Sequence, residues 1–292
     1  MDSKDFRLLV ALHGDGRQSL QRLGRSVSLS APAVRNRLRR LEELDVLQGY
    51  WVSVDPAIFR RKDLFVFFGG EWSREDAIRT MEASDVAWVA RKFDGGLTVK
   101  VWPHDAQRAL ATLSGVLERP PHGHVVAPST ERGELSPIDW RVIDALLDDP
   151  RARIRALAEA TGLSPKTVRK HLAALTRAGV ISILPRLGSL TGAGDLVYHL
   201  AVHGTAPMPE LRRVLGDAVL IHETREPPLQ YLFCRASGLG ELTAKTRAAG
   251  RVPGIESVQV TLNREMLVGT RFVHRLVQER IDAWSQARPT QR

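Results

Sequence analysis

The 292-residue chain contains a single cysteine, Cys234, and it has neither a long apolar run nor many aromatic side chains. One cysteine excludes an internal disulfide and a zinc site made of several cysteines. No apolar run approaches the ~20 residues that a membrane-spanning helix needs. The first residues also lack the apolar core of a secretory signal. We therefore expect a cytoplasmic protein with no membrane partner.

The sequence also lacks the short motifs of common nucleotide-binding and hydrolytic enzymes. It has no glycine-rich phosphate loop, Walker-type motif or nucleophile elbow. His199 and His203 lie four residues apart, and His122 and His124 share a loop, but neither pair has a cysteine or carboxylate at metal-ligand spacing. The sequence therefore predicts no catalytic residue, no bound metal and no cofactor, so that the protein is not an enzyme.

Acidic residues are scarce in two segments of the chain. Residues 17–40 contain seven basic residues and no acidic one, and residues 151–177 contain seven basic residues and only Glu159 as an acid. These segments carry +7 and +6, so the rest of the chain, with a total of +9, carries 9 − 13 = −4. Such concentrated positive charge indicates contact with a polyanion. The alternative is an arginine-rich surface that reflects a GC-rich genome and is merely solvated.

The two basic segments belong to an internal repeat. Residues 6–50 align without a gap on residues 140–184, an offset of 140 − 6 = 134. Each copy predicts two short helices, a tight turn and a third helix with apolar residues at i, i+4 and i+7. Ser30 and Ser164 are placed to cap the third helices, and an extended apolar stretch follows each one. This pattern is typical of a winged helix-turn-helix.

A different pattern follows each helical unit, with elements in the order β-α-β-β-α-β. The predicted fold class is therefore α+β, with two winged helix-turn-helix domains alternating with two ferredoxin-like domains of the dimeric α-β barrel type. The expected boundaries are 1–52 for the first helix-turn-helix domain, 62–130 for the first ferredoxin-like regulatory and assembly domain, 136–185 for the second helix-turn-helix domain, 195–268 for the second ferredoxin-like domain, and 269–292 for a C-terminal helix and tail.

This layout resembles the Lrp/AsnC family of transcriptional regulators. The residues that carry the resemblance are the repeated apolar positions and turn serines: Leu23, Leu29, Ser30, Val34, Leu38, Leu41 and their copies Leu157, Leu163, Ser164, Val168, Leu172, Leu175. The resemblance implies a regulator that binds double-stranded DNA, with RAM-type domains that pair subunits and often sense an amino acid or related metabolite. One chain would then act as an internal pseudo-dimer, and it could form a homo-oligomer.

The resemblance also points to an effector site in the ferredoxin-like domains. The first domain keeps the aromatic-Asp pair of the family, Phe93 and Asp94, but Arg91 and Lys92 stand before it where the family usually has glycine. The implied effector-binding residues are Phe93, Asp94, Arg225 and Tyr231.

The DNA-binding residues expected from the sequence fall into two groups. Arginines of the second helices and the turns before them are expected to neutralise phosphates: Arg22, Arg25, Arg153 and Arg155. Outward residues of the third helices, with their capping serines, are expected to reach base edges or flank them: Ser30, Arg35, Asn36, Arg39, Arg40, Ser164, Lys166, Thr167, Arg169 and Lys170. Because the outward residues differ between copies, we expect two related but non-identical half-sites about one helical turn apart, or a multiple of it.

Two other interpretations remain open at this point. The third helices could be structural, with a solvated arginine face, or could contact proteins. Sirohaem decarboxylases also resemble this family and come as paired or fused halves. The candidates for holding a tetrapyrrole are His222, Arg225, Tyr231, Arg91 and Lys92. The histidine-rich strand expected of those enzymes is absent, and the basic third helices favour the regulator.

Overall fold

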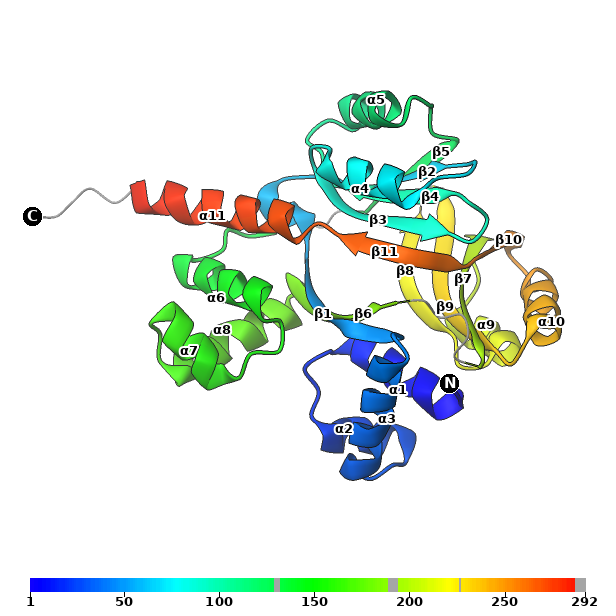
Figure 1. The fold of residues 1–292 in the computed structure, drawn as a ribbon, viewed down its shortest axis with the longest axis horizontal. Helices are drawn as coiled ribbons and strands as arrows, with labels where there is room; N and C mark the ends of the chain where they lie inside the picture. The colour runs from blue at the N-terminus through cyan, green and yellow to red at the C-terminus, as the bar shows by residue number, and fades with distance from the viewer. Residues whose placement is uncertain (129–131, 189–193, 226, 287–292) are drawn as a thin grey trace, which may run out of the picture.

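A computed structural model describes residues 1–128, 132–188, 194–225 and 227–286 of the chain. It confirms the expected fold class, α+β, with two winged helix-turn-helix units and two ferredoxin-like units (Figure 1). No helix within the described ranges combines the length and apolarity that a membrane crossing requires.

The two helix-turn-helix units have the same elements at the same spacing. The first contains α1 (Ser3–Gly14), α2 (Leu20–Val27), α3 (Ala31–Glu43) and β1 (Leu47–Val54). The second contains α6 (Pro137–Asp148), α7 (Ile154–Thr161), α8 (Pro165–Arg177) and β6 (Ile181–Leu187). Each helix of the second unit begins and ends 134 residues after its counterpart, as in 137 − 3 and 177 − 43. That offset is the one that the sequence repeat predicts.

Local chemistry explains why α3 and α8 begin where they do. The Ser30 hydroxyl accepts a hydrogen bond from the Ala33 N–H at 3.3 Å, and the Ser164 hydroxyl accepts one from the Thr167 N–H at 3.1 Å. Both hydroxyls satisfy helix-end donors that would otherwise be unpaired. The preceding turns need a left-handed residue, which is Gly162 (φ 64°) in the second unit and Ser28 (φ 55°) in the first. The expected caps are therefore confirmed.

The ferredoxin-like units each form an antiparallel sheet with two helices on its outer face. The short helix η1 (Pro56–Phe59) precedes the first unit. That unit contains β2 (Asp63–Phe68), α4 (Arg74–Glu82), β3 (Val86–Lys92), β4 (Leu97–Val101), α5 (Ala106–Leu117) and β5 (Gly123–Ala127). The second contains β7 (Leu196–Gly204), α9 (Met208–Leu215), β8 (Val219–Arg225), β9 (Pro228–Ala236), α10 (Leu239–Ala249) and β10 (Ile255–Thr261).

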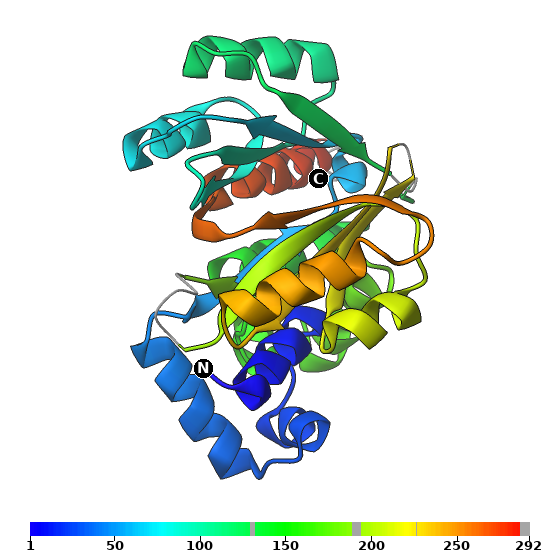
Figure 2. The same ribbon diagram turned by 90° about the vertical axis from the view of Figure 1, so that its right-hand side faces the viewer.

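Alternation along the strands gives each sheet two apolar faces. In β2 every second residue is buried, and Leu64, Val66 and Phe68 pack under α4 and α5. The opposite faces of the two sheets meet at a small cluster around Val125, Ala201, Leu229, Phe67 and Tyr231. The sheets therefore face each other, with their helices outside (Figure 2).

The last strand crosses from one sheet to the other. β11 (Asn263–Val268) follows β10 directly, but it pairs with β3, so the first sheet has the order β11-β3-β4-β2-β5 and the second has β10-β7-β9-β8. The expected second domain, 195–268, had placed residues 263–268 with the second sheet, and the structure places them in the first. α11 (Thr270–Gln286) then packs on α6, and residues 287–292 of the expected C-terminal segment lie outside the described residues.

The two helix-turn-helix units pair with each other through their wings, and each unit packs on the sheet of the other half of the chain. β1 pairs antiparallel with β6, with Val52 opposite Ile183. The first unit packs on the second sheet, where Phe6 stacks on Phe233 with ring centroids 5.2 Å apart. The second unit packs beside the first sheet, near Trp102 and Phe59, and against α11. Each helical unit thus rests on the sheet that follows the other one in sequence.

Candidate nucleic-acid interface

The outer face of α3 carries the predicted base-reading residues of the first unit. Arg35, Asn36, Arg39 and Arg40 are exposed, because the apolar positions of the same helix are turned into the core. Arg39 lies loosely between Asn36, 3.5 Å away, and Glu43, 3.9 Å away. At 68% side-chain exposure this arginine is held weakly, and it remains available to a ligand.

The outer face of α8 presents the second set. Lys166, Arg169 and Lys170 are exposed, and Thr167 is half-buried. The Thr167 hydroxyl lies 2.9 Å from that of Ser164, so these two residues are already engaged in capping the helix. The structure therefore gives Ser30 and Ser164 a structural role, and their contact with DNA stays a prediction.

The predicted phosphate-binding arginines lie beside these helices. Arg22 and Arg25 project from α2 into solvent, and Arg153 occupies the N-cap position of α7. None of these three forms an ion pair within the part of the chain that the structure describes. Arg155 differs, because its Nε lies 3.0 Å from Glu159 at i+4, a pair that is largely exposed and therefore weak.

Two arginines of the basic segments serve the fold instead. Arg37 binds Asp5 at 2.7 Å and Asp2 at 2.8 Å, which seats α3 on α1. Arg17 donates hydrogen bonds to the backbone oxygens of Pro150, at 2.8 Å, and of Ala152, at 2.6 Å. Its guanidinium therefore crosses from the first helical unit to the second. Sequence reasoning had counted these side chains only as surface charge.

Arg151 supplies a further contact between the two units. Its guanidinium lies over the ring of Tyr50, 4.5 Å from the centroid, on the first wing. Arg17 and Arg151 occupy equivalent positions, since 151 − 17 = 134. Together with the β1–β6 pairing, these contacts hold the two units in one frame.

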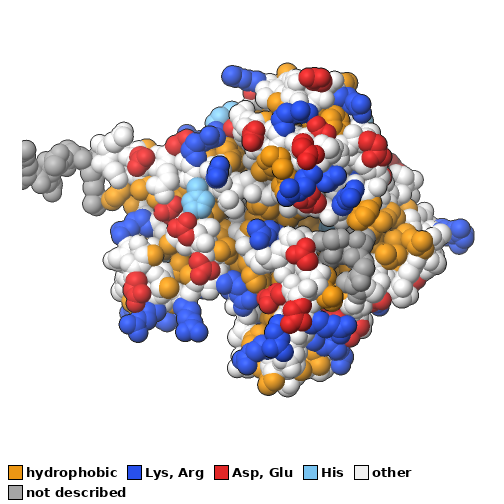
Figure 3. All heavy atoms as spheres, viewed as in Figure 1, with side chains coloured by type: hydrophobic (Ala, Val, Ile, Leu, Met, Phe, Trp, Pro, Cys, Tyr) orange, Lys and Arg blue, Asp and Glu red, His pale blue; other side chains and the backbone are white. Residues whose placement is uncertain are grey.

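Basic side chains gather at the outer ends of both helical units. Figure 3 shows Lys and Arg on the two lobes formed by the helical units, on either side of an open notch. Within the described ranges, eight of these side chains are exposed and form no ion pair: Arg22, Arg25, Arg35, Arg40, Arg153, Lys166, Arg169 and Lys170. Positive charge displayed in two sets on one frame fits a polyanion with a repeating backbone.

The predicted effector residues are spread around the joint between β10 and β11. Phe93 is 45% exposed, and its N–H donates to the Leu262 oxygen at 2.9 Å. Asp94 accepts from the N–H of Gly96 at 3.0 Å, which shapes the β3–β4 loop. Tyr231 lies between the sheets and hydrogen-bonds Thr261, and burial raises the pKa of its hydroxyl. Arg225 ends β8 opposite Pro228. These positions bring Phe93 and Tyr231 to the same joint.

Three of the residues considered for a tetrapyrrole enzyme make contacts within the protein. Arg91 binds Glu265 at 3.2 Å, and the Lys92 ammonium lies 5.6 Å from the centroid of the Phe67 ring. The His222 ring packs on Phe65 with centroids 5.1 Å apart. They come from two facing sheets, with the two cations on β3 and the histidine on β8.

These features together define a winged helix-turn-helix protein with exposed basic third helices. A model of the AsnC-type helix-turn-helix domain matches residues 1–42, and a model of winged helix-turn-helix DNA-binding domains matches residues 135–182. These matches place the first helix-turn-helix segment beside domains of the AsnC type, and the second beside winged helix-turn-helix DNA-binding domains.

Curated relatives agree with this placement. The chain is 42% identical over 59 residues to an uncharacterized HTH-type transcriptional regulator of Pyrococcus horikoshii, covering 20% of this chain and 38% of that protein. It is 36% identical over 56 residues to the HTH-type transcriptional regulator Ptr1 of Methanocaldococcus jannaschii, covering 19% of this chain and 38% of that protein. The matches therefore span well under half of the length of these relatives.

Solved structures are more distant. A crystal structure of the siroheme decarboxylase NirDL has a TM-score of 0.49 and 12% identity, over 97% of this chain and 100% of that one. The leucine response regulatory protein of Mycobacterium tuberculosis has a TM-score of 0.33 and 20% identity, over 47% of this chain and 98% of that one. At these TM-scores neither likeness bears on the activity of this chain.

Proposed function

We propose that the chain is a sequence-specific DNA-binding transcriptional regulator of the Lrp/AsnC type, in which one chain supplies both halves of a pseudo-dimer. The observation that carries the proposal is the pair of exposed basic helices, α3 and α8, held on one frame by the β1–β6 ribbon. A pair of recognition helices on a two-fold frame is suited to two half-sites on one face of a duplex.

Electrostatics would supply most of the affinity. Arg22 and Arg25 in the first unit, with Arg153 in the second, are placed on the flanks of the recognition helices, where phosphates of a bound duplex lie. Each phosphate neutralised releases condensed counterions, so affinity falls with salt by a slope of about 0.9 per contact. The Arg155–Glu159 pair is exposed, so its cost of opening is small.

Specificity would come from the outward residues of α3 and α8. Arg35 and Arg169 are equivalent, since 169 − 35 = 134, so the two half-sites would share a base read by arginine, typically guanine. Asn36 is equivalent to Lys170, and Arg39 to an alanine at 173. Asparagine pairs well with adenine, so the half-site read by α3 would contain an adenine that the other need not have.

The ferredoxin-like units would respond to a small molecule and support assembly. The candidates for effector binding are Phe93, Asp94, Arg225 and Tyr231, of which Phe93 and Tyr231 reach the β10–β11 joint. A ligand there, an amino acid or related metabolite, would act on the strand that links the two sheets. Assembly of several chains would multiply the half-sites that one particle covers.

Selection of bound duplexes from a random library by the purified full chain tests the proposal. We expect a bipartite site with two related, non-identical halves whose centres lie about one helical turn apart or a multiple of it. Charge reversal of Arg35 and Arg39 to glutamate should then weaken binding at least tenfold and should reduce the salt slope.

The matched control is the double variant Arg108→Glu and Arg213→Glu. These arginines are exposed on α5 and α9, on the outer faces of the sheets and outside the helix-turn-helix units. The control removes the same charge, so it should keep most of the affinity. Equal losses in the two double variants, or a single isolated half-site, would reject the proposal.

A further inference from the structure

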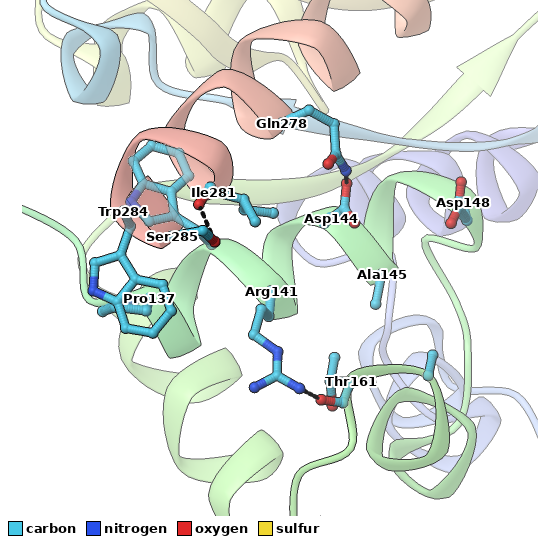
Figure 4. Close-up of a pocket in the computed structure, with 12 residues that line it drawn as sticks. Pro137, Arg141, Asp144, Ala145, Asp148, Thr161, Gln278, Ile281, Trp284 and Ser285 are labelled. Atoms are coloured by element: carbon cyan, nitrogen blue, oxygen red, sulfur yellow. Dashed lines mark hydrogen bonds between the residues drawn. The ribbon is translucent and has the colours of Figure 1, made fainter. Parts of the chain in front are cut away.

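A cavity of ≈ 410 Å³ lies between α6 of the second helical unit and the C-terminal helix α11 (Figure 4). Its walls include the rings of Trp140 and Trp284 and the apolar side chain of Ile281. Its charged side chains are Arg141, Asp144 and Asp148. A volume in the range of a few hundred Å³ suits a small organic molecule.

The cavity exists where the two halves of the molecule differ. In the first unit, Arg7 of α1 reaches the second sheet and binds Asp217 at 2.9 Å. Its equivalent is Arg141, since 141 − 7 = 134, yet Arg141 donates to the backbone oxygen of Thr161 inside its own unit. In the second unit α11 packs on α6, with Phe272, Val273, Leu276 and Val277 buried. The cavity therefore lies at the α6–α11 contact, where the second unit is packed differently from the first.

The acidic groups of the cavity are also specific to the second unit. Asp144 and Asp148 stand where the first unit has Val10 and Gly14, at the same offset of 144 − 10 = 134. Asp144 accepts a hydrogen bond from the Gln278 amide of α11 at 2.5 Å, and its side chain is 29% exposed. Two carboxylates have thus replaced uncharged residues on the face of α6 that meets α11.

The cations around these carboxylates are poorly placed to neutralise them. His274 lies 3.9 Å from Asp144 and 3.8 Å from Asp148, beyond hydrogen-bond distance, and it carries charge only when protonated. Arg141 is held by the Thr161 carbonyl oxygen. Burial raises the pKa of Asp144 despite the Gln278 bond. A cation in the cavity would therefore form an ion pair with Asp144, whose charge its neighbours only partly offset.

The indole rings complete the chemistry. An ammonium or guanidinium group near an indole face is attracted by the quadrupole of the ring, and more strongly when the pair is shielded from water. Figure 4 shows Trp284 and Ile281 on α11 and Asp144 and Arg141 on α6. Asp144 is turned toward Gln278 of α11, whereas Arg141 is turned toward Thr161. A ligand in this place would touch both helices at once.

We propose that this cavity binds a small organic cation, whose charged group is held by Asp144 and whose apolar body packs on Trp140 and Trp284. A ligand that touches both helices favours the arrangement in which α6 and α11 are closed on it. Resting on the proposed function, its occupancy sets how α6 packs on α11, and α6 in turn packs on α8, the basic third helix of the same unit. DNA and the cation are then coupled ligands, each changing the affinity of the other by the same factor.

The test of the site uses the full chain and a panel of probes, without DNA. The probes are the phenethylammonium, tetraethylammonium and agmatine cations, with 3-phenylpropionate and 2-phenylethanol as an anion and a neutral molecule of similar size. Binding is measured by calorimetry, and by tryptophan fluorescence because two of the six tryptophans line the cavity. We expect saturable binding of at least one cation and none of the anion at millimolar concentration.

Asp144→Asn keeps the shape and an acceptor for Gln278 but removes the charge. It should weaken cation binding at least tenfold. The control Asp282→Asn removes the same charge from an exposed position of α11 and should leave binding unchanged. Circular dichroism verifies that both variants are folded. Absence of binding by all three cations, equal binding of the anion, or an unchanged affinity in Asp144→Asn would overturn the site.

The regulatory part is tested by measuring DNA affinity with and without the bound probe. A shift of at least threefold that Asp144→Asn abolishes supports it, and an unchanged affinity in a chain that binds both DNA and the probe overturns it. A chain that binds the probe but no DNA keeps the cation site and rejects the proposed function together with the regulation. A chain that binds DNA but no probe keeps the proposed function and rejects the cation site together with the regulation.

Discussion

His171 lies 2.7 Å from Asp139, Nδ1 to Oδ1, at the place where the first helical unit pairs Arg37 with Asp5. The positions are equivalent in both partners, since 171 − 37 and 139 − 5 both equal 134. Each carboxylate also completes the capping box at the start of its own first helix. In each unit, one carboxylate therefore caps the first helix and also anchors the third helix, which presents the basic face.

The first prediction concerns how the contact between Asp139 and His171 responds to acid. Burial alone would raise the pKa of Asp139, but hydrogen bonds from Ser136 and His171 outweigh it and lower the pKa below its ordinary value. A lowered carboxylate pKa contributes stability that is present above the unfolded pKa of about 3.9 and is lost as pH falls through the folded value. The second unit should therefore resist acid down to about pH 4.

His171→Ala removes one of these hydrogen bonds. It should lower the free energy of unfolding at pH 7 by about 1–3 kcal/mol, and it should move the acid-induced loss of stability to higher pH. Urea denaturation followed over a pH series checks this. His104→Ala, at an exposed loop position, is the control and should change neither quantity. An acid midpoint that does not move in His171→Ala would contradict the role given to Asp139.

The second prediction concerns the contact between the helical units. The Arg17 guanidinium is partly desolvated, which lowers its pKa, and it donates to two backbone oxygens around Pro150. Hydrogen bonds from a charged donor contribute about 1.5–3 kcal/mol each. Arg17→Ala should therefore loosen the frame, and it should widen the range of half-site spacings that the chain tolerates.

A series of duplexes with the half-sites moved apart one base pair at a time measures this tolerance. The wild-type chain should show a sharp optimum, and Arg17→Ala a broad one with a smaller maximum. Arg108→Ala, on α5, serves as the control with an unchanged optimum. If Arg17→Ala weakened binding equally at every spacing, the side chain would act as a simple phosphate contact instead.

Local patterns predicted the elements, whereas long-range contacts decided their partners. The apolar spacing of Val34, Leu38 and Leu41, and the serine caps, were enough to find α3 and its buried face. The pairing of β1 with β6 could not be found in this way, because an extended apolar stretch shows that it needs a partner but not which one. The same limit hid β11, whose pattern fits either sheet.

The candidate site shows the same division. Exposure of Arg35 and Arg169 follows from helical periodicity, because they lie opposite the apolar stripe of their helices. The internal role of Arg37 depends on Asp5, 32 positions earlier in the chain, which no local pattern connects to it. The repeat did hold a clue, since Arg37 becomes His171 while its carboxylate partner is kept as Asp139.

The third prediction concerns a half-buried histidine, His199, where the first helical unit meets the second sheet. The His199 ring stacks on Tyr231 with centroids 5.1 Å apart and lies near Asn263, whose amide is 3.4 Å from Nδ1. Burial, with a smaller contribution from His13 of α1, lowers the pKa of His199 to about 4. A histidine held neutral contributes stability that is complete above the unfolded pKa of about 6.5 and is lost as pH falls toward 4.

The wild-type chain should therefore lose on the order of 3 kcal/mol of stability through this group between pH 6.5 and pH 4. His199→Gln cannot titrate, so its stability should fall less steeply over the same range. Chemical denaturation at several pH values measures both slopes. His104→Gln, which changes an exposed histidine, should keep the wild-type slope. Identical slopes in all three chains would show that His199 takes up its proton over the same pH range in the folded and the unfolded chain.

The fourth prediction concerns Gly269, between β11 and α11. Its N–H donates to the Ala87 oxygen at 2.7 Å, and a Cβ added there would lie 2.8 Å from the Val86 oxygen and 2.8 Å from the Met81 methyl. The methyl group of Met81 can move, but the backbone oxygen belongs to β3 and cannot. Gly269→Ala should therefore lower the free energy of unfolding by about 1–3 kcal/mol through overpacking.

Gly115→Ala supplies the matched comparison, because it makes the same chemical change where space is open. Gly115 lies inside α5, and a Cβ there would meet nothing within 4 Å. Alanine loses less backbone freedom than glycine in a helix, so this variant should gain about 0.5–1 kcal/mol. Thermal and urea denaturation of the two variants should thus shift in opposite directions. A neutral Gly269→Ala would mean that β11 can move away from β3, and that the crossing strand holds α11 less firmly than its contacts indicate.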